Sequence, residues 1–260
     1  MNRLKDKQIL ITGASRGLGR ELALDFARQG ASAIVLTSRR AEDLEEIKEE
    51  IAGIAPETGV RIVAADLSRP EEIERLVATA LSEFGGRLDV LVNNASVLGP
   101  TPMPFLLDYP LEDFREVLNV NLIAPFLLIK KALPAMIERG GSIINVTSDA
   151  GRNGYPGWGA YGISKFGIEG MSETWAAELE DSEVRVNRVD PGDMNTRMHR
   201  DAEPDEDPAE WSDPADVTEV FIYLASDESK GVSGRRFQAQ EENWGLEEDL
   251  PSVETVAGGK

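Results

Sequence analysis

A tyrosine and a lysine four residues apart are the pair in this chain best suited to move a proton. Tyr161 and Lys165 have the spacing that places two side chains on one face of a helix. A free tyrosine has a pKa of about 10 and is a weak base at neutral pH, but a neighbouring ammonium group favours the phenolate. The pair could therefore give a proton to a carbonyl oxygen or take one from an alcohol.

A serine and a glycine-rich turn add to this pair. Ser148 follows the strand expected over 142–147, so it lies at the carboxyl edge of a sheet, where its hydroxyl can polarise a substrate oxygen. Gly13, Gly17 and Gly19 join the first expected strand to a helix. Glycines there let a pyrophosphate approach the backbone at a helix N-terminus. The sequence therefore predicts nucleotide binding beside proton transfer.

Strand-like runs alternate with longer helical patterns along the chain. The strands are expected at 8–11, 33–36, 60–64, 88–92, 142–147 and 184–189, with a weaker one at 236–239. The helices are expected at 17–29, 41–54, 70–84, 111–139, 161–180 and 214–225. Ser68 and Asp213 are expected to cap two helices that a proline opens. This alternation predicts an α/β fold of the Rossmann type, a doubly wound parallel sheet of about seven strands with helices on both faces.

The domain organisation expected from the sequence is simple. Residues 1–240 form one domain, because no linker divides them. The acidic, proline-containing stretch 193–213 is expected to be a lid, and 241–260 an acidic tail. The connection 97–110 holds four prolines and is expected to be irregular.

Ordered motifs over residues 7–239 make the chain resemble the short-chain dehydrogenases/reductases. The glycine turn, Asn93-Asn94-Ala95, Tyr-x-x-x-Lys and Pro191-Gly192 follow in the order of that family. Ser96 stands where the family usually has glycine. The resemblance implies four catalytic residues, which are Asn121, Ser148, Tyr161 and Lys165. It also implies that Asn121 holds a water that connects Lys165 to solvent.

The resemblance implies a nicotinamide cofactor as well. Asp66 would contact the adenine ring, and Pro191, Gly192 and Thr196 would touch the nicotinamide end. The cofactor-binding residues expected are Gly13, Ser15, Arg16, Gly17, Leu18, Gly19, Ser38, Arg39, Asp66, Leu67, Asn93, Ala95, Tyr161, Lys165, Pro191, Gly192 and Thr196.

The residues at the end of the second expected strand indicate which nicotinamide cofactor the protein prefers. NAD-specific dinucleotide folds carry an acid there, which bonds the ribose 2′-hydroxyl. Here that position is Ser38, and Arg39 follows it. Arg16, inside the glycine turn, could point at the same phosphate, and two guanidiniums bind a phosphate well. We therefore predict that NADP(H) is preferred over NAD(H).

Composition narrows the possible partners. The formal charge of −20 argues against nucleic-acid binding, and an acidic surface fits either a salt-rich cytoplasm or a GC-rich genome. The chain has no cysteine and one histidine, His199, so no metal centre is expected. There is no signal-peptide pattern, and the apolar run 122–129 is too short to span a membrane. A cytoplasmic protein without membrane contact is expected.

The function expected is an NADP(H)-dependent oxidoreductase that reduces a carbonyl to an alcohol, or the reverse. The substrate is either of the 3-oxoacyl-reductase kind or a general ketone or alcohol, since pocket loops do not name a molecule. The alternative is a non-catalytic sensor of nicotinamide nucleotides. A serine hydrolase is disfavoured because no Gly-x-Ser-x-Gly nucleophile elbow is expected and because the single histidine, His199, lies in an acidic loop. Apolar residues on helices 111–139 and 161–180 predict a homo-oligomer, a tetramer in particular.

Overall fold

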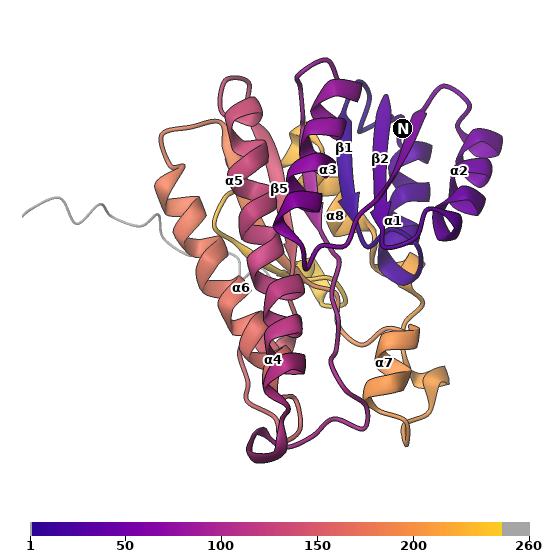
Figure 1. Ribbon diagram of the computed structural model, residues 1–260. Coiled ribbons are helices and arrows are strands. Elements are labelled where there is room, and N and C mark those ends of the chain that lie inside the picture. Colours follow the sequence, from indigo (N-terminus) through magenta and orange to yellow (C-terminus); the bar gives the residue numbers. More distant parts are fainter. Residues whose placement is uncertain (1, 246–260) are drawn as a thin grey trace, which may run out of the picture.

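Parallel strands form the centre of the molecule, in the order β3-β2-β1-β4-β5-β6-β7. The computed structural model describes residues 2–245 (Figure 1). The strands are β1 (Gln8–Thr12), β2 (Ala33–Ser38), β3 (Gly59–Ala64), β4 (Val90–Asn93), β5 (Gly141–Val146), β6 (Val184–Asp190) and β7 (Arg236–Gln238). Every neighbouring pair is parallel, so the chain must cross over between strands.

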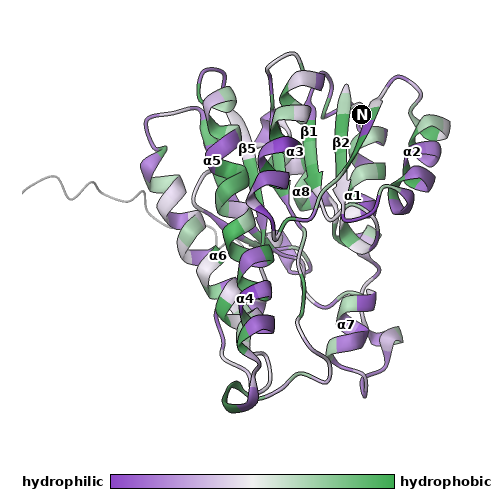
Figure 2. Ribbon diagram, viewed as in Figure 1, coloured by the Kyte–Doolittle hydropathy of each residue, from purple (hydrophilic) through white to green (hydrophobic). Residues whose placement is uncertain are grey.

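Helices cover both faces of this sheet. They are α1 (Gly17–Arg28), α2 (Glu42–Ile54), α3 (Pro70–Glu83), α4 (Leu111–Leu118), α5 (Ala124–Met136), α6 (Gly159–Glu178), α7 (Arg197–Ala202) and α8 (Glu219–Ala225). Helices α1, α2 and α8 pack on one face and α3, α5 and α6 on the other. Figure 2 shows hydrophobic residues concentrated on the strands and on the helices beside them. The predicted Rossmann-type fold is confirmed.

Successive side chains of a strand point to opposite faces of the sheet, so the fold has one hydrophobic core on each face. In β1, Ile9 and Ile11 point into the core on the side of α1, and Leu10 points into the other. All three side chains are fully buried. A strand buried on both faces reads as a continuous apolar run, which is why the sequence predicts β1 so directly.

The helix expected over 111–139 is interrupted. A π-helical turn, Asn119–Ile123, lies between α4 and α5, which otherwise run on as one rod (Figure 1). By length and composition the segment Leu111–Met136 is able to cross a membrane, but 44% of its most apolar window is buried inside the fold. That burial is on the sheet, where Leu128 and Ile129 belong to the core, so the segment is weak evidence for a membrane span.

Two predicted caps have different outcomes. Asp213 does cap a helical turn, because its Oδ1 accepts a hydrogen bond of 2.9 Å from the amide of Ala215. The prediction for Ser68 is wrong, since α3 begins at Pro70 and its N-cap is Arg69. The hydroxyl of Ser68 instead donates to Asp66 at 2.8 Å, a local turn that competes with helix capping.

The stretch expected as a lid has more local structure than its composition suggests. It contains α7 and a 3₁₀ turn, Pro208–Glu210. Thr196 caps α7 by accepting a hydrogen bond from the amide of His199 at 3.2 Å. Of the expected acidic tail 241–260, residues 246–260 lie outside the part of the chain that the structure describes.

Candidate active site

One cavity of about 1300 Å³ runs along the carboxyl edge of the sheet. Its walls come from the β1–α1 turn, the ends of β2 and β3, the loops after β4 and β5, and the segment from the end of β6 into α7. Most residues expected at the site line it: Gly13, Ser15, Arg16, Gly17, Leu18, Ser38, Arg39, Asp66, Leu67, Ala95, Ser148, Tyr161, Lys165, Pro191, Gly192 and Thr196. Gly19, Asn93 and Asn121 are not among the lining residues.

The glycine turn needs its glycines for different reasons. Gly13 has φ +64°, and a Cβ on it would lie 2.7 Å from Cα of Ala95. A Cβ on Gly19 would overlap the carbonyl oxygen of Gly13, so this glycine serves close packing and not the cavity wall. Gly17 has φ +54°, and a Cβ on it would lie 3.2 Å from the methyl group of Thr196. The turn is therefore built from backbone held tightly against its surroundings.

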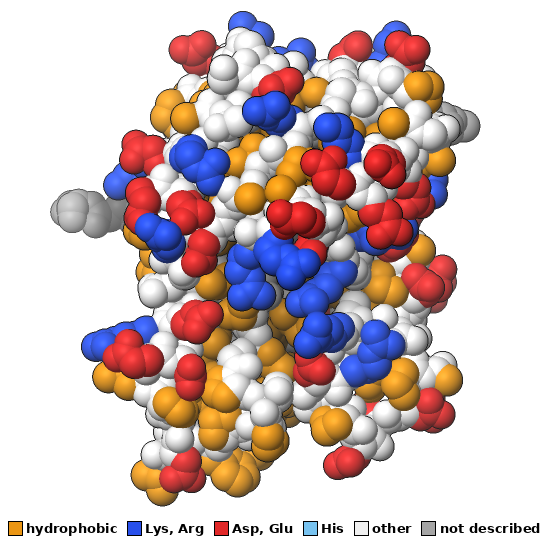
Figure 3. Space-filling view, turned by 45° about the vertical axis from the view of Figure 1, so that its right-hand side comes forward, with side chains coloured by type: hydrophobic (Ala, Val, Ile, Leu, Met, Phe, Trp, Pro, Cys, Tyr) orange, Lys and Arg blue, Asp and Glu red, His pale blue; other side chains and the backbone are white. Residues whose placement is uncertain are grey.

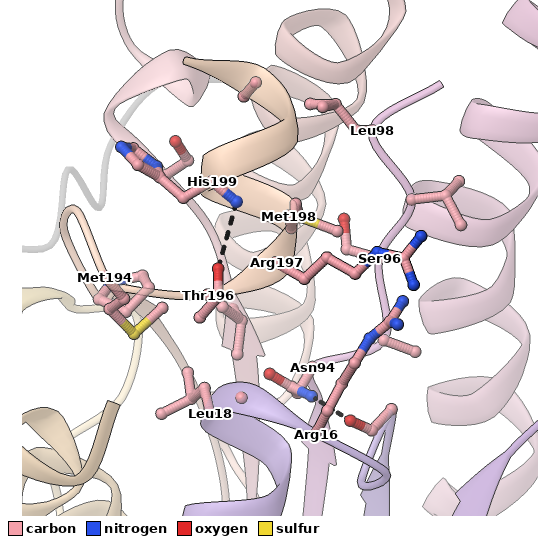
Figure 4. A pocket seen from close by; sticks show the side chains of 18 of the residues that line it. Arg16, Leu18, Asn94, Ser96, Leu98, Met194, Thr196, Arg197, Met198 and His199 are labelled. Atoms are coloured by element: carbon pink, nitrogen blue, oxygen red, sulfur yellow. Dashed lines mark hydrogen bonds between the residues drawn. The ribbon is translucent and has the colours of Figure 1, made fainter. Parts of the chain in front are cut away.

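The N-terminus of α1 opens toward the cavity. Its N-cap residue, Arg16, has an extended backbone and makes no side-chain cap hydrogen bond. The first amides of a helix have no partner within the helix, and they carry its positive dipole end. Asn94 fixes the strand that leads into this turn, because its amide donates to the carbonyls of Thr12 at 2.8 Å and Gly13 at 3.1 Å. Figure 4 draws one of these two bonds. This arrangement suits an anionic group such as a pyrophosphate.

Arginines gather at the same part of the cavity. Within residues 2–245, Arg16 and Arg39 make no ion pair within 4.0 Å, whereas Arg40 binds Asp43 at 2.6 Å. Arg197, on α7, also lines the cavity, and Figure 4 shows its guanidinium and that of Arg16 directed to the same place. Figure 3 shows basic side chains gathered in the middle of a face that otherwise mixes both signs. Arg197 also pairs with Asp201 at 3.6 Å, so within the described residues Arg16 and Arg39 are the members of this group that have no carboxylate partner.

Tyr161 lies at the other end of the cavity, on the first turns of α6. Its ring is buried in a small apolar cluster with Leu98 and Ala150, and the Trp158 ring meets it edge-on at 5.5 Å. Burial raises the pKa of Tyr161, the Asp190 carboxylate raises it further, and the neighbouring Ser148 side chain acts to lower it. The sequence suggested that Lys165 favours the phenolate, but in this structure the protonated phenol is the favoured form.

Lys165 is buried on the same helix face. It is 3% exposed, and its Nζ donates a hydrogen bond to the carbonyl of Val146 at 2.9 Å. Nζ lies 5.3 Å from the centre of the Tyr161 ring. Burial lowers the pKa of Lys165 to about 8, although the carboxylates of Asp190 and Glu169 act to raise it. Lys165 can therefore release and regain a proton near neutral pH.

Ser148 and Asn121 complete the expected set of four in different ways. The Ser148 hydroxyl donates to Asp149 at 3.0 Å and faces the cavity. Asn121 sits on the π-helical turn behind the wall, where its side chain pairs with both backbone groups of Val97 at 2.8 and 2.9 Å. It also donates to Ser164, the residue before Lys165, at 3.1 Å. The fold thus brings Ser148, Tyr161 and Lys165 to one cavity and places Asn121 in contact with the lysine's own turn.

A buried group of charged residues beneath this set is absent from the sequence-based expectations. Its members are Arg188 and Asp190 on β6, Glu169 on α6 and Arg236 on β7. Asp190 also lines the cavity. The sequence does contain one signal of this charged group. Arg188 lies inside a strand expected to be buried on both faces, where a charged side chain requires a partner.

The expectation that the chain has no Gly-x-Ser-x-Gly spacing is wrong, because Gly13, Ser15 and Gly17 in the glycine turn have the spacing of the serine-hydrolase nucleophile elbow. Such a nucleophile needs a histidine within hydrogen-bond reach. His199 lies on α7 and not in a loop, its ring packs against Trp211 at 4.3 Å, and no described hydrogen bond joins it to Ser15. The hydrolase alternative therefore has no support from this geometry.

Comparison with known proteins decides the family. A family model described as short chain dehydrogenase matches residues 7–207. The chain is a short-chain dehydrogenase/reductase. This short-chain dehydrogenase/reductase is 35% identical to the uncharacterized oxidoreductase YciK of Escherichia coli, over 91% of this chain and 93% of that protein. It is 36% identical to the 3-oxoacyl-[acyl-carrier-protein] reductase FabG of Thermotoga maritima, over 90% and 96% of the two chains.

Solved structures agree with this assignment. A short chain dehydrogenase from Pseudomonas syringae superposes on this short-chain dehydrogenase/reductase with a TM-score of 0.87, at 39% identity, covering 92% of this chain and 96% of that one. A short chain dehydrogenase from Escherichia coli complexed with NADPH has a TM-score of 0.85 at 33% identity, covering 93% and 100% of the two chains.

Proposed function

We propose that this short-chain dehydrogenase/reductase interconverts a carbonyl compound and an alcohol, with NADP(H) preferred over NAD(H). The observation that carries the proposal is a single cavity with arginines at one end and Ser148, Tyr161 and Lys165 at the other. A fold alone does not define a reaction, but this arrangement puts anion recognition and proton transfer in one cavity.

The residues present fit a phosphorylated dinucleotide. The open N-terminus of α1 suits the pyrophosphate, and Arg16 and Arg39 are free of carboxylate partners within the described chain, as a 2′-phosphate site requires. The related Escherichia coli structure complexed with NADPH supports the same choice. Bound NADP(H) would supply or accept the hydride.

Tyr161 is the proposed proton donor. Because burial keeps its phenol protonated, Tyr161 can give that proton to the carbonyl oxygen when hydride reaches the carbonyl carbon, and an alcohol results. Ser148 would hold the same oxygen through its hydroxyl. Lys165, with its pKa near 8, would return a proton to Tyr161, and a water held near Asn121 would reload Lys165.

The substrate is proposed to be a 3-oxoacyl thioester or another ketone with an apolar portion. Tyr161 lies in an apolar cluster to which Met103, Trp158, Met198 and Ala202 also belong. Two of these side chains come from α7, which supports a role of 193–213 as a lid over the substrate within a single catalytic domain. The FabG relatives reduce 3-oxoacyl-[acyl-carrier-protein], as their name states.

A panel of ketones, 3-oxoacyl thioesters and aldehydes with NADPH tests the proposal by loss of absorbance of the reduced cofactor. Tyr161→Phe should retain less than about a hundredth of the wild-type rate, since general acids contribute roughly 10²–10⁴-fold. Its NADPH affinity should stay nearly unchanged, because the hydroxyl is not a phosphate ligand. Tyr223→Phe makes the same change outside the cavity and is the matched control.

Two outcomes would refute the assignment. A Tyr161→Phe variant as active as the Tyr223→Phe control would exclude Tyr161 as proton donor. A wild-type protein that binds NADPH but turns over no member of the panel would favour the alternative of a non-catalytic nicotinamide-nucleotide sensor.

A further inference from the structure

Asp190 ends β6 at the floor of the cavity and is held there from two sides. Its Oδ2 accepts a hydrogen bond from Nη2 of Arg236 at 2.7 Å, and its Oδ1 accepts one from the amide of Gly192 at 3.0 Å. The side chains of Asp190 and Arg236 are each 9% exposed. A carboxylate buried this deeply is costly unless it is paired, and the Arg236 guanidinium compensates the Asp190 carboxylate.

Arg236 binds more than this one carboxylate. Its Nε donates to Glu169 at 3.1 Å, and its Nη2 also approaches the carbonyl of Ser148 at 3.5 Å. Glu169 in turn accepts a hydrogen bond from Arg188 and lies one helical turn after Lys165. Arg236 therefore ties together the end of β5, the end of β6 and the helix that carries Tyr161 and Lys165.

The charged groups that face Tyr161 and Lys165 come from four elements. They are Asp190 from β6, Asp149 from the connection after β5, Glu169 from α6 itself, and Arg236 from β7 behind the carboxylates. Asp190 is buried and lines the same cavity as Tyr161 and Lys165, and its carboxylate acts to raise the pKa of both. Asp149 is exposed, and Glu169 divides its charge between Arg188 and Arg236.

We propose that Asp190, fixed by Arg236, is a positioning residue whose negative charge holds protons on both Tyr161 and Lys165 and thereby favours carbonyl reduction. The inference rests on the proposed function, in which these two residues exchange protons with the substrate. A negative charge stabilises the ammonium of Lys165 and destabilises the phenolate of Tyr161, so both effects keep the pair loaded with protons. Carbonyl reduction consumes one proton per turnover, so it uses this form.

The sign of the effect gives a direct test on the cofactor-free protein. Lysine labelled with ¹³C at Cε is followed by NMR over pH, and the Lys165 signal is the one absent from Lys165→Arg. The wild-type midpoint is expected at about 8. Asp190→Asn keeps the shape of the side chain but removes its charge, and it should lower the midpoint by about one pH unit or more.

A matched control lies at the outer end of the same charged group. Glu173 binds Arg188, but its side chain is 61% exposed. Glu173→Gln should leave the Lys165 midpoint in place. If Asp190→Asn fails to fold, because it leaves Arg236 buried without its partner, the double variant Asp190→Asn/Arg236→Gln removes both charges. Its midpoint should fall by less than in Asp190→Asn, because loss of the Arg236 cation acts in the opposite direction.

Turnover supplies a second readout. In the reductive direction the alkaline limb of kcat/KM against pH should move to lower pH in Asp190→Asn and stay in place in Glu173→Gln. A merely structural role of Asp190 would lower the rate at every pH without moving this limb. An unchanged Lys165 midpoint in Asp190→Asn would overturn the inference even if the enzyme reduces ketones. A lowered midpoint would support the effect of the Asp190 charge on Lys165 even if the proposed reaction class is wrong.

Discussion

Replacement of Arg39 by alanine should change which cofactor the protein binds. Arg39 follows β2, is exposed, lines the cavity and has no ion-pair partner within the described residues. Arg16 lines the same part of the wall and would remain in the variant. We therefore expect Arg39→Ala to weaken NADPH binding without abolishing it.

The expected size follows from one lost contact. A hydrogen bond to a charged group contributes about 1.5–3 kcal/mol, and each 1.4 kcal/mol is a factor of ten in affinity. The NADPH dissociation constant should rise roughly ten- to a hundredfold. NADH has no 2′-phosphate, so its dissociation constant should change little. The preference for NADPH should fall by the same factor.

Fluorescence titration with each reduced cofactor measures this, and kcat/KM with each cofactor checks it in turnover. Arg40→Ala is the matched control, because Arg40 is the next residue along the chain but already binds Asp43 at 2.6 Å. If Arg40→Ala weakens NADPH as much as Arg39→Ala does, general charge attraction explains the effect and a defined phosphate site does not exist. A wild-type protein that uses NADH as well as NADPH would refute the cofactor preference itself.

Three further results are expected. Lys165→Met should inactivate the enzyme yet raise its melting temperature at pH 7, because burial that lowers the pKa of Lys165 from 10.5 to about 8 costs the folded state on the order of 3 kcal/mol. The gain in melting temperature should shrink as pH rises from 8 to 10.5, since the unfolded chain then also loses this proton. A gain that stays constant with pH would contradict the expectation. Gly19→Ala should abolish cofactor binding in titrations, because its methyl group would overlap the Gly13 carbonyl, and normal binding would show that α1 can shift. Light scattering should give a tetramer for the wild type. Phe166 is 47% exposed on α6, so Phe166→Asp should give a smaller species. A monomeric wild type would refute the predicted assembly.

The fold was predictable because buried strands and amphipathic helices leave strong periodic patterns. The π-helical turn at Asn119–Ile123 leaves none, since its residues suit an ordinary helix equally well. It depends on a tertiary contact, the pairing of Asn121 with the backbone of Val97. The cap expected at Ser68 failed for a different, local reason, because the Ser68 hydroxyl donates to Asp66, two residues earlier, and the helix begins only at Pro70.

The site was predictable only where its residues form local motifs. Tyr161 and Lys165 are four apart, so helix geometry alone brings them together. Asp190 and Arg236 are 46 positions apart, and only the pairing of β6 with β7 brings them into contact. The raised pKa of Tyr161 depends on burial by loops whose course the sequence does not specify.

The strand order has a consequence for protein engineering. The sheet reverses its winding between β1 and β4, so Arg16 and Arg39 come from the first half of the chain, whereas Ser148, Tyr161 and Lys165 come from the second, as does Arg197 on α7. The two halves meet at a seam where the hydroxyl of Thr12 donates to the carbonyl of Val92 and accepts from the amides of Asn94 and Ala95. Grafts that exchange the dinucleotide half between relatives can therefore keep this seam unchanged, and the two properties become separately adjustable modules.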